Sequence, residues 1–217
     1  SLGGDGTVLK GFRNLPSFDI PILGLNFGKF GFLTMNCKNK VKTVKDVIAE
    51  QFFISPRIYL TAFLIAKNKK QFMGNALNEM VIFREDIRMV RFEIKFGSAI
   101  FQLRADGMII STPTGSTAHA FSAGGPIVFP EEKTMIIVAL APFATTWRNC
   151  IYEGSRLLIK SSGNCNIVMD GQEKFTLQKD KPLEIKIGDG VFKLLVSKDW
   201  NFWKTLKEKF LWGKTLS

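Results

Sequence analysis

The chain has 217 residues, of which 46% are hydrophobic and 23% are charged. This composition is ordinary for a soluble globular protein and allows a substantial core in one domain or in two small ones. The longest apolar runs, at 62–66 and 135–141, are far shorter than a spanning helix needs, so the sequence predicts no transmembrane segment.

A net charge of +11 points to an anionic partner. The lysines are scattered among phenylalanines and isoleucines and do not form one basic stripe, so we expect anionic phosphates and no nucleic acid as partners. The cysteines Cys37, Cys150 and Cys165 are odd in number and widely spaced, with no CxxC pair. This pattern predicts a reducing, cytoplasmic environment without a disulfide framework or a zinc site.

The first motif is GGDGT, at residues 3–7. Its glycines let the backbone turn tightly and approach a phosphate closely, and they hold Asp5 on a rigid turn. A plain Gly-Asp-Gly turn without function is the alternative interpretation. The segment 21–34, PILGLNFGKFGFLT, follows with a short apolar strand and glycines spaced among aromatic residues.

Residues 41–52 carry apolar side chains at 41, 44, 47, 48 and 52. This spacing predicts a helix with one buried face. Ser55 and Pro56 end it, and we place a domain boundary there.

After Pro56 the pattern changes to short β-rich segments separated by turn residues, which predicts an all-β domain. Hairpin turns are expected at Gly97-Ser98 and at 188–190. The predicted strands are 59–66, 79–83, 90–96, 100–103, 135–141, 157–160, 167–169, 183–187 and 191–196.

The run 105–126, ADGMIISTPTGSTAHAFSAGGP, is the most informative stretch of the chain. An apolar strand at 108–110 leads into a turn of small hydroxyl residues, and the turn leads into the start of a helix. Such a turn exposes backbone N–H groups and hydroxyls that suit a phosphate or the polar edge of a nucleotide. An ordinary strand-turn-helix is the alternative, because serine and threonine are common helix caps. We favour the functional interpretation because the hydroxyls are dense and lie between two glycine turns.

Residues 198–212 return to a helical pattern, with Trp203, Leu206 and Phe210 on one face. Packing against the core is the expected role of this face, and an amphipathic membrane anchor is the competing one.

Three other kinds of site are excluded by the motifs that are missing. GKT at 213–215 has no glycine five residues earlier, so it is not a Walker A loop. The segment 120–124 lacks the first glycine of GxSxG, which argues against a hydrolase. His119 is the single histidine and has no cysteine nearby, so a conventional zinc site is not expected.

Four segments together resemble the motifs of the NAD kinase family: GGDGT, the run 105–126, NE at 78–79 and DGQ at 170–172. The resemblance implies an α+β fold, with an N-terminal Rossmann-like α/β portion, an all-β C-terminal domain, and a last helix that packs back on the first domain. We therefore expect 1–55 and 199–217 to form a partial Rossmann-like domain that carries GGDGT, and 56–198 to form an all-β NAD-binding domain. In the family a buried strand precedes GGDGT, so we expect further elements of the first domain before Ser1.

The resemblance implies a bacterial-type NAD kinase, which transfers the γ-phosphate of ATP to the 2′-hydroxyl of the adenosine ribose of NAD+ to give NADP+. Such a transfer needs a held donor phosphate, a cation and a base near the acceptor hydroxyl. Asp5 is the candidate base, although it could instead orient the Mg²⁺ or other divalent cation that accompanies ATP. The residues implied to bind the phosphates of ATP are Gly3, Gly4, Gly6 and Thr7.

The resemblance also implies where NAD+ binds. Asn78 and Glu79 would hold ribose hydroxyls, which need donors and acceptors together. Arg104 would face a phosphate and Asp106 the far base and its amide, with a cross-strand ion pair on a solvated face as the alternative for both. The full implied NAD-binding set is Asp5, Gly6, Phe32, Asn78, Glu79, Arg88, Arg104, Asp106, Thr117, Ala118, His119, Ser122, Ala141 and Gln172.

The family's usual assembly implies a homotetramer or homodimer, with Asp106 and Ala141 contributed across a subunit interface. Two alternatives stay open at this point. A lipid kinase of the diacylglycerol or sphingosine kind shares GGDGT but leaves the run 105–126 unexplained. A dinucleotide-binding sensor without catalysis is favoured by His119, which stands where the family usually has tyrosine.

Overall fold

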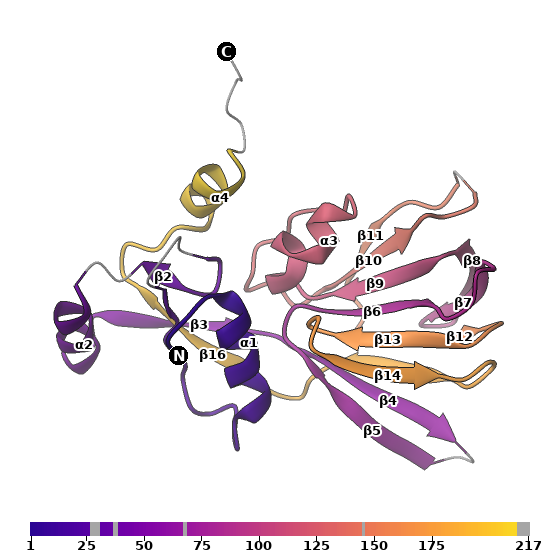
Figure 1. The fold of residues 1–217 in the computed structure, drawn as a ribbon, viewed down its shortest axis with the longest axis horizontal. Coiled ribbons are helices and arrows are strands. Elements are labelled where there is room, and N and C mark those ends of the chain that lie inside the picture. The colour runs from indigo at the N-terminus through magenta and orange to yellow at the C-terminus, as the bar shows by residue number, and fades with distance from the viewer. Residues whose placement is uncertain (27–30, 37–38, 67–68, 145, 212–217) are drawn as a thin grey trace. The chain divides into compact units, whose positions relative to one another are not determined.

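The computed structural model describes residues 1–26, 31–36, 39–66, 69–144 and 146–211. The chain forms two compact units, the first made of Ser1–Pro56 with Phe192–Ser217 and the second of Arg57–Val191 (Figure 1). The fold is α+β, as predicted, with helices mainly in the first unit and strands mainly in the second. None of the helices in the described part of the chain has both the length and the apolar character needed to cross a bilayer.

The first unit is built from short elements around helix α1. Two strands, β1 (Leu25–Asn26) and β2 (Met35–Asn36), pair in parallel, and β3 (Phe52–Arg57) pairs with β16 (Phe192–Ser197). Helices α1 (Asp5–Asn14), α2 (Lys40–Ile48) and α4 (Phe202–Phe210) complete this unit.

Helix α1 was not predicted, since GGDGT was interpreted as a turn with Asp5 upon it. In the structure Asp5 is instead the first residue of a helix that begins after Gly4. The helix buries Val8, Leu9 and Phe12, and the Phe12 ring stacks on Phe18 with centroids 4.9 Å apart. Burial of this apolar stripe stabilises a helix whose glycines lower its intrinsic propensity.

Helix α2 ends at Ile48 and not at 52, because residues 52–57 form β3. The expected buried face is exposed in this chain: Val41, Val44 and Ile48 are 65%, 51% and 77% accessible. The spacing of apolar residues therefore predicted the helix but not the exposure of its apolar face.

Helix α4 belongs to the first unit, which confirms that the last helix packs back on the first domain. Its buried residues are Phe202, Thr205 and Leu206, whereas Trp203, expected on that face, is 55% exposed. The predicted end of the helix at 212 lies outside the described residues.

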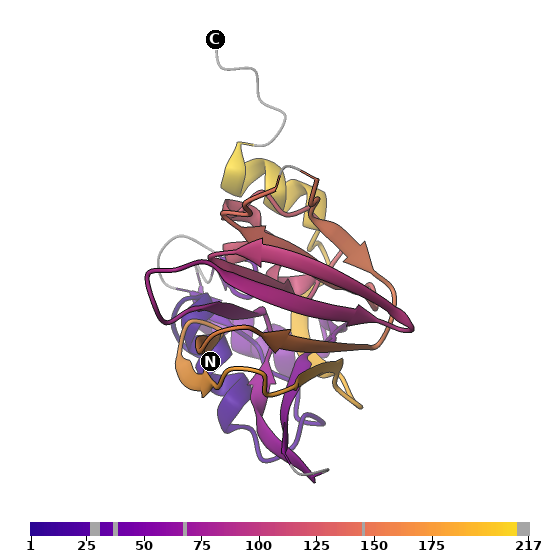
Figure 2. The ribbon, with the colours of Figure 1, turned by 90° about the vertical axis from the view of Figure 1, so that its right-hand side faces the viewer.

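The second unit is an antiparallel β-sandwich of two six-stranded sheets, ordered β11-β10-β9-β6-β13-β14 and β5-β4-β15-β12-β7-β8. The β7–β8 hairpin faces the viewer in Figure 2 and confirms the turn predicted at Gly97-Ser98. The strands are β4 (Leu60–Ala66), β5 (Lys69–Ala76), β6 (Glu79–Arg84), β7 (Val90–Phe96), β8 (Ala99–Ala105), β9 (Gly107–Ser111), β10 (Met135–Leu140), β11 (Cys150–Tyr152), β12 (Arg156–Ser161), β13 (Cys165–Met169), β14 (Glu173–Leu177) and β15 (Leu183–Ile187).

Two differences from the predicted strands change the topology. Residues 188–190 are not a hairpin turn, because β15 pairs with β4 and β12 while β16 pairs with β3 in the first unit. Strands β5, β11 and β14 were not predicted, since β5 and β14 are largely polar or exposed and β11 has only three residues.

The central strands of the first sheet are buried on both faces. Met80, Met108 and Ile137 point into the main core between the two sheets. Val81, Ile109 and Ile136 alternate with them and form a second cluster with Ala120 and Val128. The segment after β9, with the short helices η1 (Thr114–Thr117) and α3 (His119–Ser122), therefore covers the outer face of this sheet.

Candidate functional site

The Asp5 carboxylate is held by the loop at 31–34, inside the first unit. One oxygen accepts a hydrogen bond from the Phe32 N–H at 2.8 Å, and the other accepts from the Leu33 N–H at 3.2 Å and from the Thr34 hydroxyl at 2.9 Å. The helix start and the loop together fix the direction of this side chain, a requirement for any group that acts on a bound substrate.

Gly3 and Gly31 leave room for the neighbouring side chains of Thr7 and Asp5, and Gly4 and Gly6 have space beside them. A Cβ on Gly31 would overlap the Asp5 carboxylate, and a Cβ on Gly3, whose φ is +146°, would lie 2.3 Å from the Thr7 hydroxyl oxygen. At Gly4 and Gly6 a Cβ would meet nothing within 4 Å, and both residues are exposed. The start of α1 therefore has space beside Gly4 and Gly6, as a close approach of a phosphate requires.

Phe32 contributes its backbone N–H to Asp5, while its half-buried ring packs against Phe210 of α4, with centroids 5.3 Å apart. Residues 27–30 of the same predicted segment lie outside the described residues. The structure thus gives Phe32 a packing and positioning role within the first unit.

In the second unit, the turn at Asn78 and Glu79 meets the loop after β9. The Thr112 N–H donates to the Asn78 carbonyl at 2.8 Å, and the Thr112 hydroxyl donates to the Leu77 carbonyl at 2.6 Å. A Cβ on Gly115 would lie 2.2 Å from the Asn78 carbonyl oxygen. Two motifs about 35 residues apart in the sequence are therefore in direct contact, as binding of one ligand by both would require.

The hydroxyls of this loop are mostly structural. Ser111 and Ser116 are fully buried, and the Ser111 hydroxyl donates to the Asn78 carbonyl. The Ser116 hydroxyl donates to the Val128 carbonyl and accepts from the Val128 N–H. The density of hydroxyl groups was the reason for expecting a phosphate cradle, but these groups satisfy buried backbone instead. The accessible part of the loop lies further along.

The exposed end of the loop carries the residues that match TAxxxS. Thr117 and Ala118 are half-buried, while His119 and Ser122 are exposed at the first and last positions of α3. Residues three apart on a helix share a face. The structure therefore places His119 and Ser122 together on an accessible surface.

Glu79 is a buried carboxyl group at the start of β6, 6% exposed. Burial raises its pKa to about 8; the nearby Asp170 adds to the rise, and the His119 backbone N–H, which hydrogen-bonds the carboxyl group, opposes it. Its Oε2 atom is buried and has no hydrogen-bond partner among the described residues. This carboxyl group can offer a proton or an acceptor to a ligand hydroxyl.

Sequence reasoning did not single out Asp170, although it noted DGQ. The Asp170 carboxylate accepts hydrogen bonds from the backbone N–H groups of Leu77, Asn78 and Glu79, at 2.9, 2.8 and 3.2 Å. Gln172, the residue of DGQ that was predicted to bind NAD+, is exposed in the same turn. Its contact with residues 77–79 depends on the pairing of β13 with β6, which the sequence does not show.

Arg104, Asp106 and Ala141 form a separate group. Asp106 links β8 to β9, its N–H donates to the Leu140 carbonyl, and Ala141 follows with a φ of +46°. The Arg104 guanidinium lies 4.8 Å from the centroid of the Phe143 ring. Arg104 and Asp106 were predicted to share one strand face, but Asp106 lies in the crossing between the two sheets, beyond the end of β8.

Asp106 also forms an ion pair, the alternative that the sequence analysis left open for it. Its carboxylate accepts from the Arg84 guanidinium at 2.7 Å, so the ion-pair alternative holds for Asp106, with Arg84 as the partner in place of Arg104. Arg88, predicted to bind NAD+, is exposed in the loop after β6, near the same end of the sheet.

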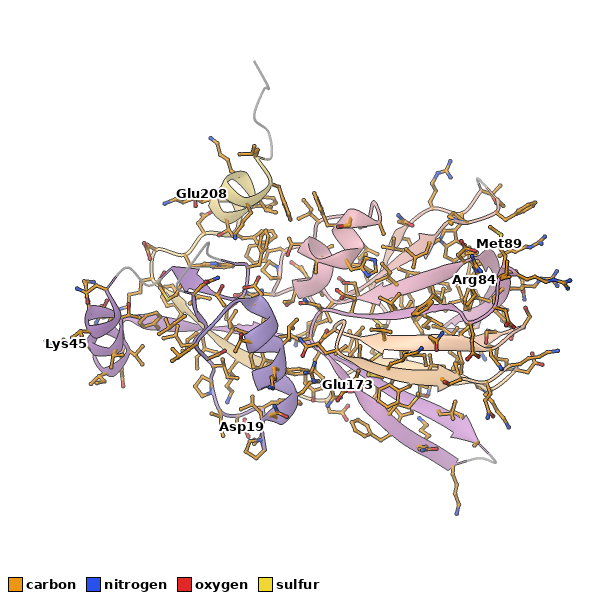
Figure 3. All side chains as sticks on the ribbon, in the orientation of Figure 1. Asp19, Lys45, Arg84, Met89, Glu173 and Glu208 are labelled. Atoms are coloured by element: carbon orange, nitrogen blue, oxygen red, sulfur yellow. The ribbon has the colours of Figure 1, made fainter. Side chains whose placement is uncertain are left out.

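The two groups of the second unit lie at opposite ends of one sheet. Glu79 pairs with Ser111 at one end of the β6–β9 ladder and Phe83 pairs with Gly107 at the other, which separates the ends by about 14 Å. Figure 3 shows Glu173, which follows the Asp170 turn, and Arg84 at these opposite ends. Asn78, Glu79 and His119 are thus brought together, and Asp106 and Ala141 are not with them.

A cation that accompanies ATP would find one carboxylate at the start of α1. Across the described residues, no three His, Cys, Asp or Glu side chains gather as a metal site would need. Mg²⁺ in nucleotide sites is held largely by phosphate and water oxygens with one or two carboxylates. Asp5 therefore fits such an ion only as one ligand beside those of the nucleotide.

Comparisons with known proteins identify related sequences and folds. The family model of the ATP-NAD kinase N-terminal domain matches residues 1–52, and that of the C-terminal domain matches 77–197. The NAD kinase of Aquifex aeolicus is 34% identical over 219 residues, covering 98% of this chain and 80% of its own length.

Two solved structures are similar in fold. A yeast NADH kinase complexed with NADH superposes with a TM-score of 0.89 at 24% identity; the match covers all of this chain but 66% of the yeast chain. An NAD kinase from Archaeoglobus fulgidus in complex with ATP has a TM-score of 0.75 at 26% identity, covering 97% of this chain and 80% of its own. With both domain models matched in order, and a relative matched over nearly the whole chain, this chain belongs to the NAD kinase family.

Proposed function

We propose that this protein transfers the γ-phosphate of ATP to the 2′-hydroxyl of the adenosine ribose of NAD+, giving NADP+ and ADP. The observation that carries the proposal is the contact between the Asn78–Glu79 turn and the loop 112–119. The fold joins these two family motifs through buried groups, and the loop ends at the exposed His119. The solved relatives are described as complexes with NADH and with ATP, the two classes of nucleotide that the reaction requires.

In this proposal the first unit holds the phosphate donor and the second binds the dinucleotide. The space beside Gly4 and Gly6, with Gly3 and Thr7 next to it, would receive the phosphates of ATP at the positive end of α1. Mg²⁺ bound by ATP would neutralise charge on those phosphates, and service as one of its ligands is the alternative to the role of base for Asp5.

Asp5 is proposed as the base. As the ribose 2′-oxygen forms its bond to the γ-phosphorus, the proton of that hydroxyl passes to the carboxylate and the bond from the γ-phosphorus to the bridging oxygen of ADP breaks. The three donors at 32–34 hold the Asp5 side chain in one orientation, which favours its use as a positioned base.

In the second unit, Asn78 and Glu79 would bind ribose hydroxyls. The proposed contacts to the bases and the diphosphate come from the exposed end of the loop, at Thr117, Ala118, His119 and Ser122. His119 can stack on a base as the usual tyrosine ring would, but it lacks the phenol hydroxyl.

Asp106, Ala141, Arg88 and Arg104 require a second copy of the chain in this proposal. They lie near the far end of the sheet from Glu79, so we propose a homodimer or homotetramer in which one protomer's Asp106 and Ala141 complete the site of its partner. A cytoplasmic location is proposed from the three separated cysteines.

The test is the purified protein with ATP, Mg²⁺ and NAD+, with NADP+ detected by an NADP-specific dehydrogenase. Asp5→Asn should lower kcat by about 100-fold or more, and Asp19→Asn, an exposed aspartate of the same unit, should not. NAD+ binding without product would support the sensor instead, and product from a lipid alcohol alone would support the lipid kinase.

A further inference from the structure

Asp170 is held in an uncommon backbone conformation directly after β13. Its φ is +50°, in the left-handed region that asparagine and aspartate tolerate better than most residues. The side chain is 6% exposed and turns back toward the start of β6. A buried carboxylate in this conformation needs compensating hydrogen bonds.

Those hydrogen bonds come from three consecutive backbone N–H groups. One Asp170 oxygen accepts from Leu77, and the other accepts from Asn78 and Glu79. The Asp170 N–H in turn donates to the Glu79 carbonyl at 3.0 Å. Charge-assisted hydrogen bonds are roughly twice as strong as neutral ones, so this contact fixes the backbone of the turn firmly.

A second observation points to a ligand at this turn. Glu79 is buried beside Asp170, and its Oε2 atom has no partner among the described residues. A buried oxygen without a hydrogen bond is costly unless a bound molecule supplies one. The Asp170 carboxylate thus anchors the backbone from which this unpartnered oxygen is presented.

We infer that Asp170 is a positioning residue for the dinucleotide: its carboxylate fixes the turn from which Asn78 and Glu79 receive the ribose hydroxyls. The inference rests on the proposed function, because it takes NAD+ as the ligand of that turn. Asp170 acts through the turn and does not itself contact the ligand.

The charge of Asp170 gives this role a measurable consequence. Burial is the main cause of the raised pKa of Glu79, and the Asp170 charge is the second. The His119 backbone N–H is the group that opposes the rise, from α3. Removing the Asp170 charge should therefore lower the pH at which Glu79 ionises, while burial keeps that pH above the ordinary value for a glutamate.

The experiment compares Asp170→Asn with Asp180→Asn. Asparagine tolerates the left-handed conformation, so the change removes the charge and one acceptor without new backbone strain. Asp180 is a matched control, since it is an exposed aspartate with a φ of +58° in a turn of the same unit. NAD+ binding by calorimetry from pH 6 to pH 9, amide hydrogen exchange at 77–79 and steady-state kinetics are measured on each protein.

We expect Asp170→Asn to raise the Kd and the KM for NAD+ by about 10-fold or more, with a smaller change in kcat. Exchange of the amides at 77–79 should become faster, and the pH dependence of NAD+ binding near pH 8 should move to lower pH. Asp180→Asn should match wild type in all three. Wild-type affinity, exchange and pH dependence in Asp170→Asn would overturn the inference.

Asp170→Glu is the second test variant, to be measured if Asp170→Asn does not fold. This variant keeps the charge but moves the carboxylate oxygens by one methylene. It should therefore weaken NAD+ binding, while the pH dependence of that binding stays near pH 8. Normal affinity together with normal amide exchange would also overturn the inference. Because binding and exchange need no turnover, they remain decisive even if wild type forms no NADP+. That last result would refute the proposed function alone.

Discussion

Gly115 offers the sharpest test of the contact between the two motifs of the second unit. A Cβ at this position would lie 2.2 Å from the Asn78 carbonyl oxygen and 2.5 Å from the Ser111 hydroxyl oxygen. The nearest obstacle is backbone, which cannot rotate away as a flexible side chain could. Gly115→Ala must therefore push the loop away from the Asn78 turn.

The size of the effect follows from that distance. An ordinary contact needs about 1 Å more than is available, and overpacking of this kind costs about 1–3 kcal/mol in unfolding free energy. For a chain of this length, each kcal/mol lowers the Tm by about 2–4 °C. A displacement of about 1 Å at a binding surface can reduce kcat/KM by about 100-fold.

The assay pairs thermal melting with NADP+ formation, and Gly163→Ala is the matched control. A Cβ on Gly163 would meet the Val90 side chain at an ordinary 3.5 Å, so this variant should melt and react like wild type. We expect Gly115→Ala to lose activity by a larger factor than its change in Tm explains. Wild-type kinetics in a folded Gly115→Ala protein would refute the proposed contribution of this contact to dinucleotide binding.

Three further predictions follow from other contacts. Unfolded Glu79 should lose its proton near the ordinary pKa of 4.5 while the folded protein keeps it to about 8, so wild type should lose stability as pH rises between these values. Glu79→Gln should remove that loss, on the order of 4 kcal/mol between pH 5 and pH 8, and equal pH slopes in denaturant melts of the two proteins would contradict it. Gly31→Ala should displace the Asp5 carboxylate and lower kcat by about 10-fold or more, as measured by NADP+ formation; an unchanged kcat would count against the proposed base. Arg84→Ala breaks a half-exposed ion pair with Asp106 and should lower the free energy of unfolding by at most about 1 kcal/mol. The loss should be smaller in high salt. A larger loss that does not depend on salt would show that the pair is buried in an assembly.

The sequence predicted most of the central strands of the second unit because their residues are continuously apolar. Runs such as 108–110 and 135–139 are buried on both faces, which the hydrophobic pattern alone can indicate. Strands β5, β11 and β14 escaped prediction because partner strands, and not their own composition, hold them.

Helix α1 shows the opposite case, in which tertiary packing overrides local propensity. Three glycines near its start favoured a turn, yet Val8, Leu9 and Phe12 are spaced to bury one helical side. That spacing, with Asp5 in the first turn, was the available signal.

The candidate site likewise has a part that the sequence could predict and a part that it could not. Motif residues such as Asp5, Asn78 and Glu79 could be named from the sequence, because their types and order are specific. Their partners could not, since the loop at 32–34 and the Asp170 turn reach them through tertiary contacts. The hydroxyls of Ser111, Thr112 and Ser116 were misjudged for the same reason, because only the fold shows that they bond buried backbone.

The most direct test of the account is ³¹P NMR of the product formed from ATP and NAD+. We predict a new monoester resonance from a phosphate on the 2′-oxygen of the adenosine ribose, formed by wild type and greatly reduced in Asp5→Asn. A phosphate at any other position, or full turnover by Asp5→Asn, would contradict the proposed reaction or its base.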